Sequence, residues 1–79
     1  FKVYPVPFDE SLSFSFNAEG ILPYEIQWYT SEGQLVDSKK GFSNYGLNTL
    51  DWKNIQVPPG TYLIVLQLGN QFTSKIIVK

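Results

Sequence analysis

The sequence predicts an all-β domain, an immunoglobulin-like sandwich of about seven antiparallel strands in two sheets. Three observations lead to this fold class: runs in which apolar and polar residues alternate, turn signals between those runs, and the lack of any stretch with helical periodicity. Short strands separated regularly by such turns are typical of a sandwich. The expected strands are residues 2–4, 11–17, 24–30, 34–39, 47–52, 61–68 and 71–78.

The first half of the chain carries the clearest alternation. Residues 11–17 alternate strictly, which gives the strand one apolar face, and residues 24–30 repeat the pattern with larger side chains. A short turn at 31–33 ends in glycine, which tolerates the positive φ that hairpin loops require. The return strand, 34–39, carries charges that discourage pairing with another chain, and is therefore expected at a sheet edge. Residues 41–46 are expected to form a loop.

The second half ends in a hairpin. Residues 47–52 form a weaker strand, and Pro59-Gly60 suits the centre of a tight turn. Residues 61–68 are rich in β-branched and aromatic side chains, which favour strands. Gly69-Asn70 fits a two-residue loop, so 71–78 is expected to pair antiparallel with the preceding strand.

Large apolar side chains on the inner strand faces predict the core. Aromatic residues make up 16% of the chain, and each ring buries about 150–250 Å². No cysteine is present, so no disulfide supplements the modest core of a domain this small. The expected core residues are Val3, Leu12, Phe14, Phe16, Ile26, Trp28, Leu35, Tyr62, Ile64, Leu66, Phe72, Ile76 and Val78.

Composition argues against several classes of function. The chain lacks histidine and cysteine, which removes the usual general base, thiol nucleophile and transition-metal ligands. We therefore expect no enzymatic activity, no metal and no cofactor. Six lysines, no arginine and a net charge of −1 do not suggest a nucleic-acid partner. The longest apolar run, 63–66, is far shorter than the ~20 residues of a membrane helix, so membrane insertion is not expected.

Aromatic residues offer an alternative function. In this alternative, a set of them stacks on sugars, as in carbohydrate-binding modules with a sandwich fold. Strand parity favours the core for Trp28 and Tyr62 and leaves the other four undetermined. A passive immunoglobulin-like spacer in a secreted protein is a further alternative. The aromatic set comprises Trp28, Tyr29, Phe42, Tyr45, Trp52 and Tyr62.

Short segments along the chain resemble a known family. They are Tyr4-Pro5-Val6-Pro7, a middle hairpin at 31–36, Gly60-Thr61-Tyr62 and the closing 75–79. In this order they resemble the type A C-terminal sorting domain of proteins exported by the type IX secretion system of Bacteroidetes-type bacteria. Val6 departs from the asparagine usual in the family. A sandwich in flagellar-hook-cap-like modules shares much of the pattern, including a tryptophan near the position of Trp52.

The resemblance implies a non-catalytic address label. Residues 1–79 would be a single C-terminal domain excised from a larger exported protein, an expectation that the lack of methionine also favours. The cargo would cross the periplasm, and the outer-membrane translocon would recognise the folded domain and deliver it to the cell surface or medium. A sortase-like protease would then remove the domain and attach the cargo to the surface.

Such a signal needs a surface and not a cleft. Leu63 and Val65 lie opposite to the core-facing residues of 61–68, and with Ile77 they are expected to form an apolar patch on the outer face of the last hairpin. A loop or the upstream cargo domain covering that patch is the alternative. The candidate recognition residues are Tyr4, Pro5, Pro7, Gly60, Tyr62, Leu63, Val65, Lys75, Ile77 and Lys79.

Overall fold

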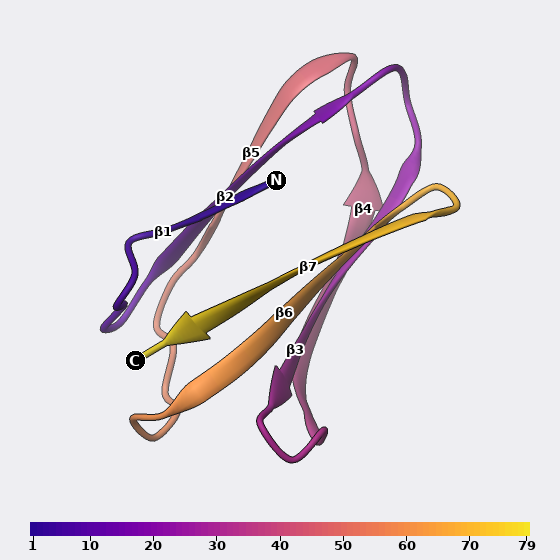
Figure 1. The fold of residues 1–79 in the computed structure, drawn as a ribbon. Coiled ribbons are helices and arrows are strands. Elements are labelled where there is room, and N and C mark those ends of the chain that lie inside the picture. The colour runs from indigo at the N-terminus through magenta and orange to yellow at the C-terminus, as the bar shows by residue number, and fades with distance from the viewer.

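The computed structural model describes residues 1–79 and contains seven strands and no helix. The strands form two antiparallel sheets, one in the order β1-β2-β5 and one in the order β4-β3-β6-β7. The two sheets form the layers of a sandwich (Figure 1). The predicted all-β sandwich is confirmed. The strands are β1 (Lys2–Tyr4), β2 (Leu12–Ala18), β3 (Pro23–Thr30), β4 (Leu35–Phe42), β5 (Gly46–Trp52), β6 (Thr61–Leu68) and β7 (Gln71–Val78).

Strand β4 determines how this sandwich differs from an antibody constant domain. In such domains the fourth strand joins the sheet of the first two, whereas β4 pairs here with β3. Its pairing continues to Gly41 opposite Tyr24 and Phe42 opposite Pro23. The loop expected at 41–46 is therefore shorter than predicted. Gly41 permits this close pairing, because a Cβ there would lie 2.7 Å from the Tyr24 hydroxyl.

The core is built around Trp28, which is 1% exposed. Its ring makes edge-to-face contacts with Phe8, Trp52 and Tyr62, at centroid separations of 5.4, 5.5 and 5.8 Å. This geometry adds to the hydrophobic gain of burying large rings. Eight of the expected core residues are buried, and Val3 is half-buried against them. The eight are Leu12, Phe14, Phe16, Ile26, Trp28, Tyr62, Ile64 and Leu66.

Strand β7 turns the opposite face to the core from the one that the sequence predicts. Phe72, Ile76 and Val78 were expected inside, but they are 67%, 71% and 44% exposed. The ladder gives the reason: Ile77 pairs with the buried Tyr62, and Ile76 pairs with the outward Leu63. Ile77 is therefore the inner residue, at 1% exposure.

Leu35 is also outside the core, at 56% exposure. A β-bulge between Trp28 and Tyr29 causes the change: Asp37 pairs with Trp28, but Leu35 pairs with the outward Tyr29. In a bulge, two residues of one strand lie opposite a single residue of its partner. The next side chain on the bulged strand therefore points to the other face of the sheet. Leu35 and Asp37 therefore lie on opposite sides of β4.

Ser43 connects two loops at one end of the sandwich, the loop between β2 and β3 and the loop between β4 and β5. Its hydroxyl accepts a hydrogen bond from the Leu22 amide at 3.0 Å and donates one to the Gly20 carbonyl at 2.7 Å. The Ser43 amide also donates to the Leu22 carbonyl at 2.8 Å. The serine is 1% exposed, so a polar group with complete hydrogen bonding joins the two loops.

Candidate functional site

Segments that are far apart in the sequence meet at one end of the sandwich, which we call the terminal end. The Phe8 amide donates to the Val78 carbonyl at 3.0 Å. Gly60 and Lys79 exchange two backbone hydrogen bonds, at 2.9 and 3.3 Å. In Figure 1 the C-terminus accordingly lies beside the turn before β6 and the segment after β1.

The segment from Tyr4 to Phe8 connects the two sheets at the terminal end. Tyr4 is still paired in β1, opposite Ser13. The chain then bends through Pro5 to Pro7, where both X–Pro bonds are cis. Phe8 is 4% exposed and contacts the core rings, so the segment places one anchor inside and leaves both prolines exposed.

Tyr62 has a structural role at the start of β6. Its hydroxyl donates a hydrogen bond to the Pro58 carbonyl, four residues upstream. A tyrosine at this corner that bonds back to the preceding backbone is a recurrent feature of immunoglobulin-like sandwiches. At 5% exposure the ring is a core side chain and cannot be read directly by a partner.

Lys79 fastens the last residue to the same corner. Its ammonium group donates to the Val57 carbonyl at 2.7 Å, in addition to its backbone pairing with Gly60. Lys75 differs, because its side chain is exposed beside β1. Of the two closing lysines, one therefore holds the fold and the other is accessible to a partner.

The outer face of the last hairpin carries an apolar surface. Leu63 and Val65 do lie on this face, as expected, and both are half-buried. Ile77 does not join them, because it faces the core. The exposed residues of β7 take its place, so the surface is wider than the sequence predicted. We define the outer hairpin patch as Leu63, Val65, Phe72, Ile76 and Val78.

One comparison with known proteins identifies the family of the chain. The model of the family described as "Secretion system C-terminal sorting domain" matches residues 2–79. The chain belongs to this family. As a sorting domain of the type IX secretion system, it carries a signal for secretion to the cell surface or extracellular space. No curated protein and no solved structure matches the chain.

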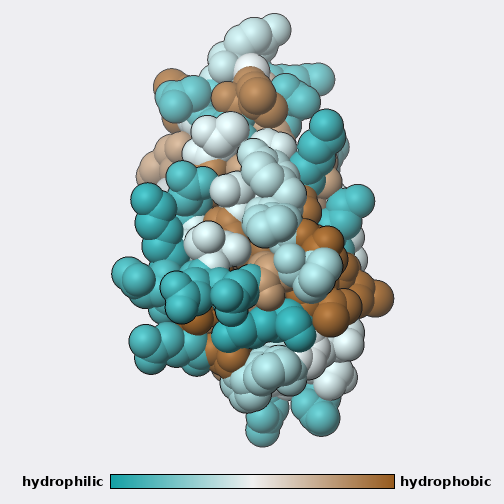
Figure 2. All heavy atoms as spheres, turned by 90° about the vertical axis from the view of Figure 1, so that its left-hand side faces the viewer, coloured by the Kyte–Doolittle hydropathy of each residue, from teal (hydrophilic) through white to brown (hydrophobic).

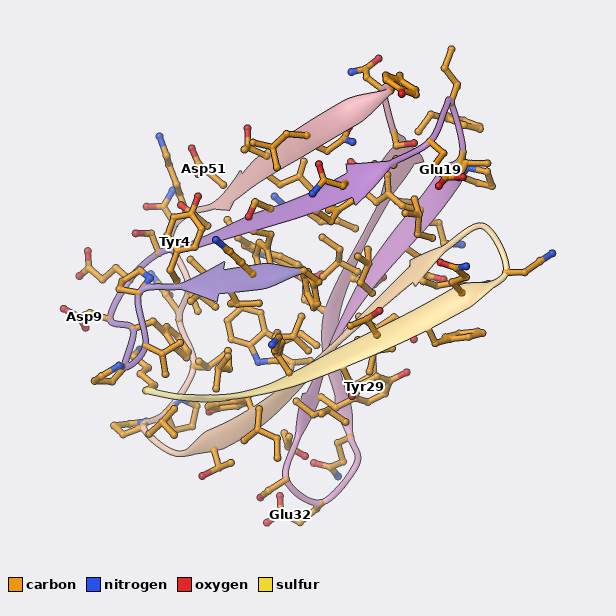
Figure 3. The ribbon with its side chains drawn as sticks, turned by 45° about the horizontal axis from the view of Figure 1, so that its top comes forward. Tyr4, Asp9, Glu19, Tyr29, Glu32 and Asp51 are labelled. Carbon is orange, nitrogen blue, oxygen red and sulfur yellow. The ribbon has the colours of Figure 1, made fainter.

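Four of the seven carboxylates of the sorting domain lie far from one another. Figure 3 shows Asp9, Glu19, Glu32 and Asp51 on separate parts of the molecule and pointing outward. Asp51 accepts a hydrogen bond from the Ser13 hydroxyl at 2.8 Å, an exposed contact on the face of the three-stranded sheet. A hydrolase of the two-carboxylate kind needs its pair about 5–9.5 Å apart across a cleft.

The sorting domain has no helical segment with the length and hydrophobicity of a membrane span.

The six candidate sugar-stacking aromatics differ in burial, with Tyr29 half-buried between a buried group and an exposed one. Trp28, Trp52 and Tyr62 are buried, and Trp52 is also covered by the Lys39 ammonium at 4.8 Å from its ring centroid. Phe42 and Tyr45 are 73% and 81% exposed. No tryptophan remains to offer an open face, which weakens the sugar-binding alternative.

Sequence reasoning missed several residues of the terminal end. Phe8, Trp52 and Ile55 are buried, although none was expected in the core. The Ile55 amide donates to the Glu10 carbonyl at 2.9 Å, which joins the two loops nearest the termini. Phe8 and Ile55 lie in irregular segments that carry no periodicity, so their only signal was size and hydrophobicity, whereas Trp52 is the last residue of β5.

Proposed function

We propose that this domain is the non-catalytic C-terminal signal by which a larger exported cargo is recognised at the outer-membrane translocon. After transit through the periplasm, the cargo reaches the surface, where a sortase-like protease removes residues 1–79 and the cargo is attached. The family match over 2–79 is the observation that supports this function most directly.

The outer hairpin patch is the surface that we assign to recognition. Phe72 and Ile76 are 67% and 71% exposed on outward positions of β7 that flank Ser74, beside the half-buried Leu63 and Val65 of β6. A contiguous exposed apolar surface on a small domain marks a contact site. Figure 2 shows hydrophobic atoms gathered in limited areas between hydrophilic ones on one face of the molecule.

The motif residues act through the fold in this proposal. Tyr62, Gly60 and Lys79 fix the corner that precedes β6 and fasten the end of β7. The Phe8 amide donates a hydrogen bond to the Val78 carbonyl at the end of the β7 edge. These contacts keep β6 and β7 in register, and the register in turn fixes the positions of the side chains that form the outer hairpin patch.

The test is an export assay with folded variants. The domain is fused to a fluorescent reporter that carries a periplasmic signal, in a bacterium with a type IX system. We expect the unaltered domain to bring the reporter to the surface or medium. The double variant Phe72→Thr/Ile76→Thr should leave it in the periplasm, since threonine keeps strand propensity but removes the apolar surface.

The matched control is the double variant Phe42→Thr/Leu47→Thr. These side chains are 73% and 66% exposed, but Phe42 is on β4, at the other edge of the four-stranded sheet, and Leu47 is on β5 of the three-stranded sheet, so both lie outside the patch. Export should continue at the level of the unaltered domain. Equal loss in both double variants would mean that general surface hydrophobicity, and not the patch, determines export.

A further inference from the structure

Strand β7 has an unpaired edge. Gly60 and Lys79 exchange hydrogen bonds, so by alternation the backbone groups of Ile77, Lys75 and Thr73 also point to β6. Those of Phe72, Ser74 and Ile76 then point away from the sheet. The Val78 carbonyl, next along this edge, is taken by the Phe8 amide. The open stretch therefore runs from 72 to 76.

A mainly apolar groove lies beside this edge, between β7 and β1. It has a volume of about 320 Å³ and is lined by residues of both strands. Strand β1 pairs only with β2, so both borders of the groove are sheet edges. Apolar side chains form most of the lining, with Phe1, Val3 and Val6 on one side and Ile76 and Ile77 on the other.

The charges at the groove have one sign. Lys2 and Lys75 line it, and none of the seven carboxylates of the chain does so. An inward-pointing lysine on an edge strand opposes pairing with an unsuitable chain. A second copy paired antiparallel along 72–76 would bring its own Lys75 close on the same face, and like charges on neighbouring strands are destabilising.

We propose that the open edge of β7 accepts an extended segment of the secretion machinery as an added strand, apolar with an acidic residue opposite Lys75. Added strands gain affinity from main-chain hydrogen bonds and specificity from alternate side chains. Outward apolar side chains of the segment continue the outer hairpin patch beyond Phe72 and Ile76. Its inward carboxylate pairs with Lys75 and approaches Lys2. This inference rests on the proposed function and names how the partner binds.

The test compares two prolines in the export assay. Ser74→Pro removes an amide that points away from β6, and proline is tolerated at such positions on edge strands. Ser38→Pro is the matched control: Ser38 lies on β4, the other edge of the same sheet, and its amide bonds only to the Asp37 carboxylate, at 2.8 Å. Both variants are first checked for folding by circular dichroism and melting.

We expect Ser74→Pro to lower surface reporter about tenfold, the factor that corresponds to about 1.4 kcal/mol of binding free energy, and Ser38→Pro to export normally. Normal export by folded Ser74→Pro, alongside an exported unaltered domain, overturns strand addition but leaves the proposed function standing. If even the unaltered domain stays periplasmic, the proposed function itself is wrong.

A charge reversal keeps the inference testable if Ser74→Pro does not fold. Lys75→Glu should lower export because it would repel the acidic residue of the added strand. Lys53→Glu is its control, since Lys53 is exposed and lies outside the groove. Equal export by the two variants contradicts an acidic occupant.

Discussion

Replacing Tyr62 by phenylalanine isolates the hydrogen bond at the corner before β6. The ring keeps its contacts with Phe8 and Trp28, at 6.3 and 5.8 Å, and only the hydroxyl that donates to the Pro58 carbonyl is lost. A hydrogen bond contributes about 0.5–1.5 kcal/mol, and an acceptor left without a partner costs about 1–3 kcal/mol. We expect the free energy of unfolding to fall by about 1–2 kcal/mol.

Urea unfolding followed by tryptophan fluorescence measures this difference. For a domain of this size, 1 kcal/mol corresponds to a fall in melting temperature of about 4–8 °C. Tyr29→Phe is the matched control: its hydroxyl bonds to the Gln27 side chain at 2.9 Å on the outer face, where the tyrosine is half-buried. That loss should cost less than about 1 kcal/mol. Equal costs for the two variants would refute the structural role assigned to the Tyr62 hydroxyl.

Three further predictions concern the core, the loops and ligands. Trp28→Ala should cost about 3–5 kcal/mol and leave the domain largely unfolded in a melting experiment, since small domains have little stability in reserve; a cooperative transition near that of the unaltered domain would contradict the core described here. Ser43→Ala should cost about 1–3 kcal/mol in urea, because it leaves the Leu22 amide and the Gly20 carbonyl without a partner, whereas Ser11→Ala, at an exposed site, should change little. Titration with cell-wall and plant polysaccharides should give no saturable change in tryptophan fluorescence; a change abolished by Tyr45→Ala would favour the sugar-binding alternative.

Most strands were predictable because their two faces differ in composition. In β2, serines alternate with Leu12, Phe14 and Phe16. In β6, buried residues alternate with residues that are half-buried or exposed. Strand β7 has three large apolar residues on its outer face and one, Ile77, inside, so alternation alone indicates the wrong face. The two-residue loop at Gly69-Asn70 indicates the correct face. It pairs Leu68 with Gln71, and counting alternate residues along β7 from Gln71 then places Ile77 on the inner face.

Other features had no sequence signal of this kind. The bulge that turns Leu35 outward depends on cross-strand pairing with Trp28 and Tyr29, which local patterns do not specify. The assembly of Phe8, Tyr62 and Lys79 at the terminal end arises from long-range contacts between segments that were each predictable only as short motifs. The candidate recognition residues thus divide by role: Tyr62 and Ile77 are core, and Leu63, Val65 and Lys75 are accessible.

The most direct test of the account is the localisation of the reporter fused to the unaltered domain. It is measured by surface protease accessibility in a host with a type IX system and in the same host with the translocon deleted. The account predicts reporter at the surface or in the medium in the first host, and reporter confined to the periplasm in the second. Reporter that remains periplasmic in several hosts with the intact system would contradict the central claim that this domain is an export signal.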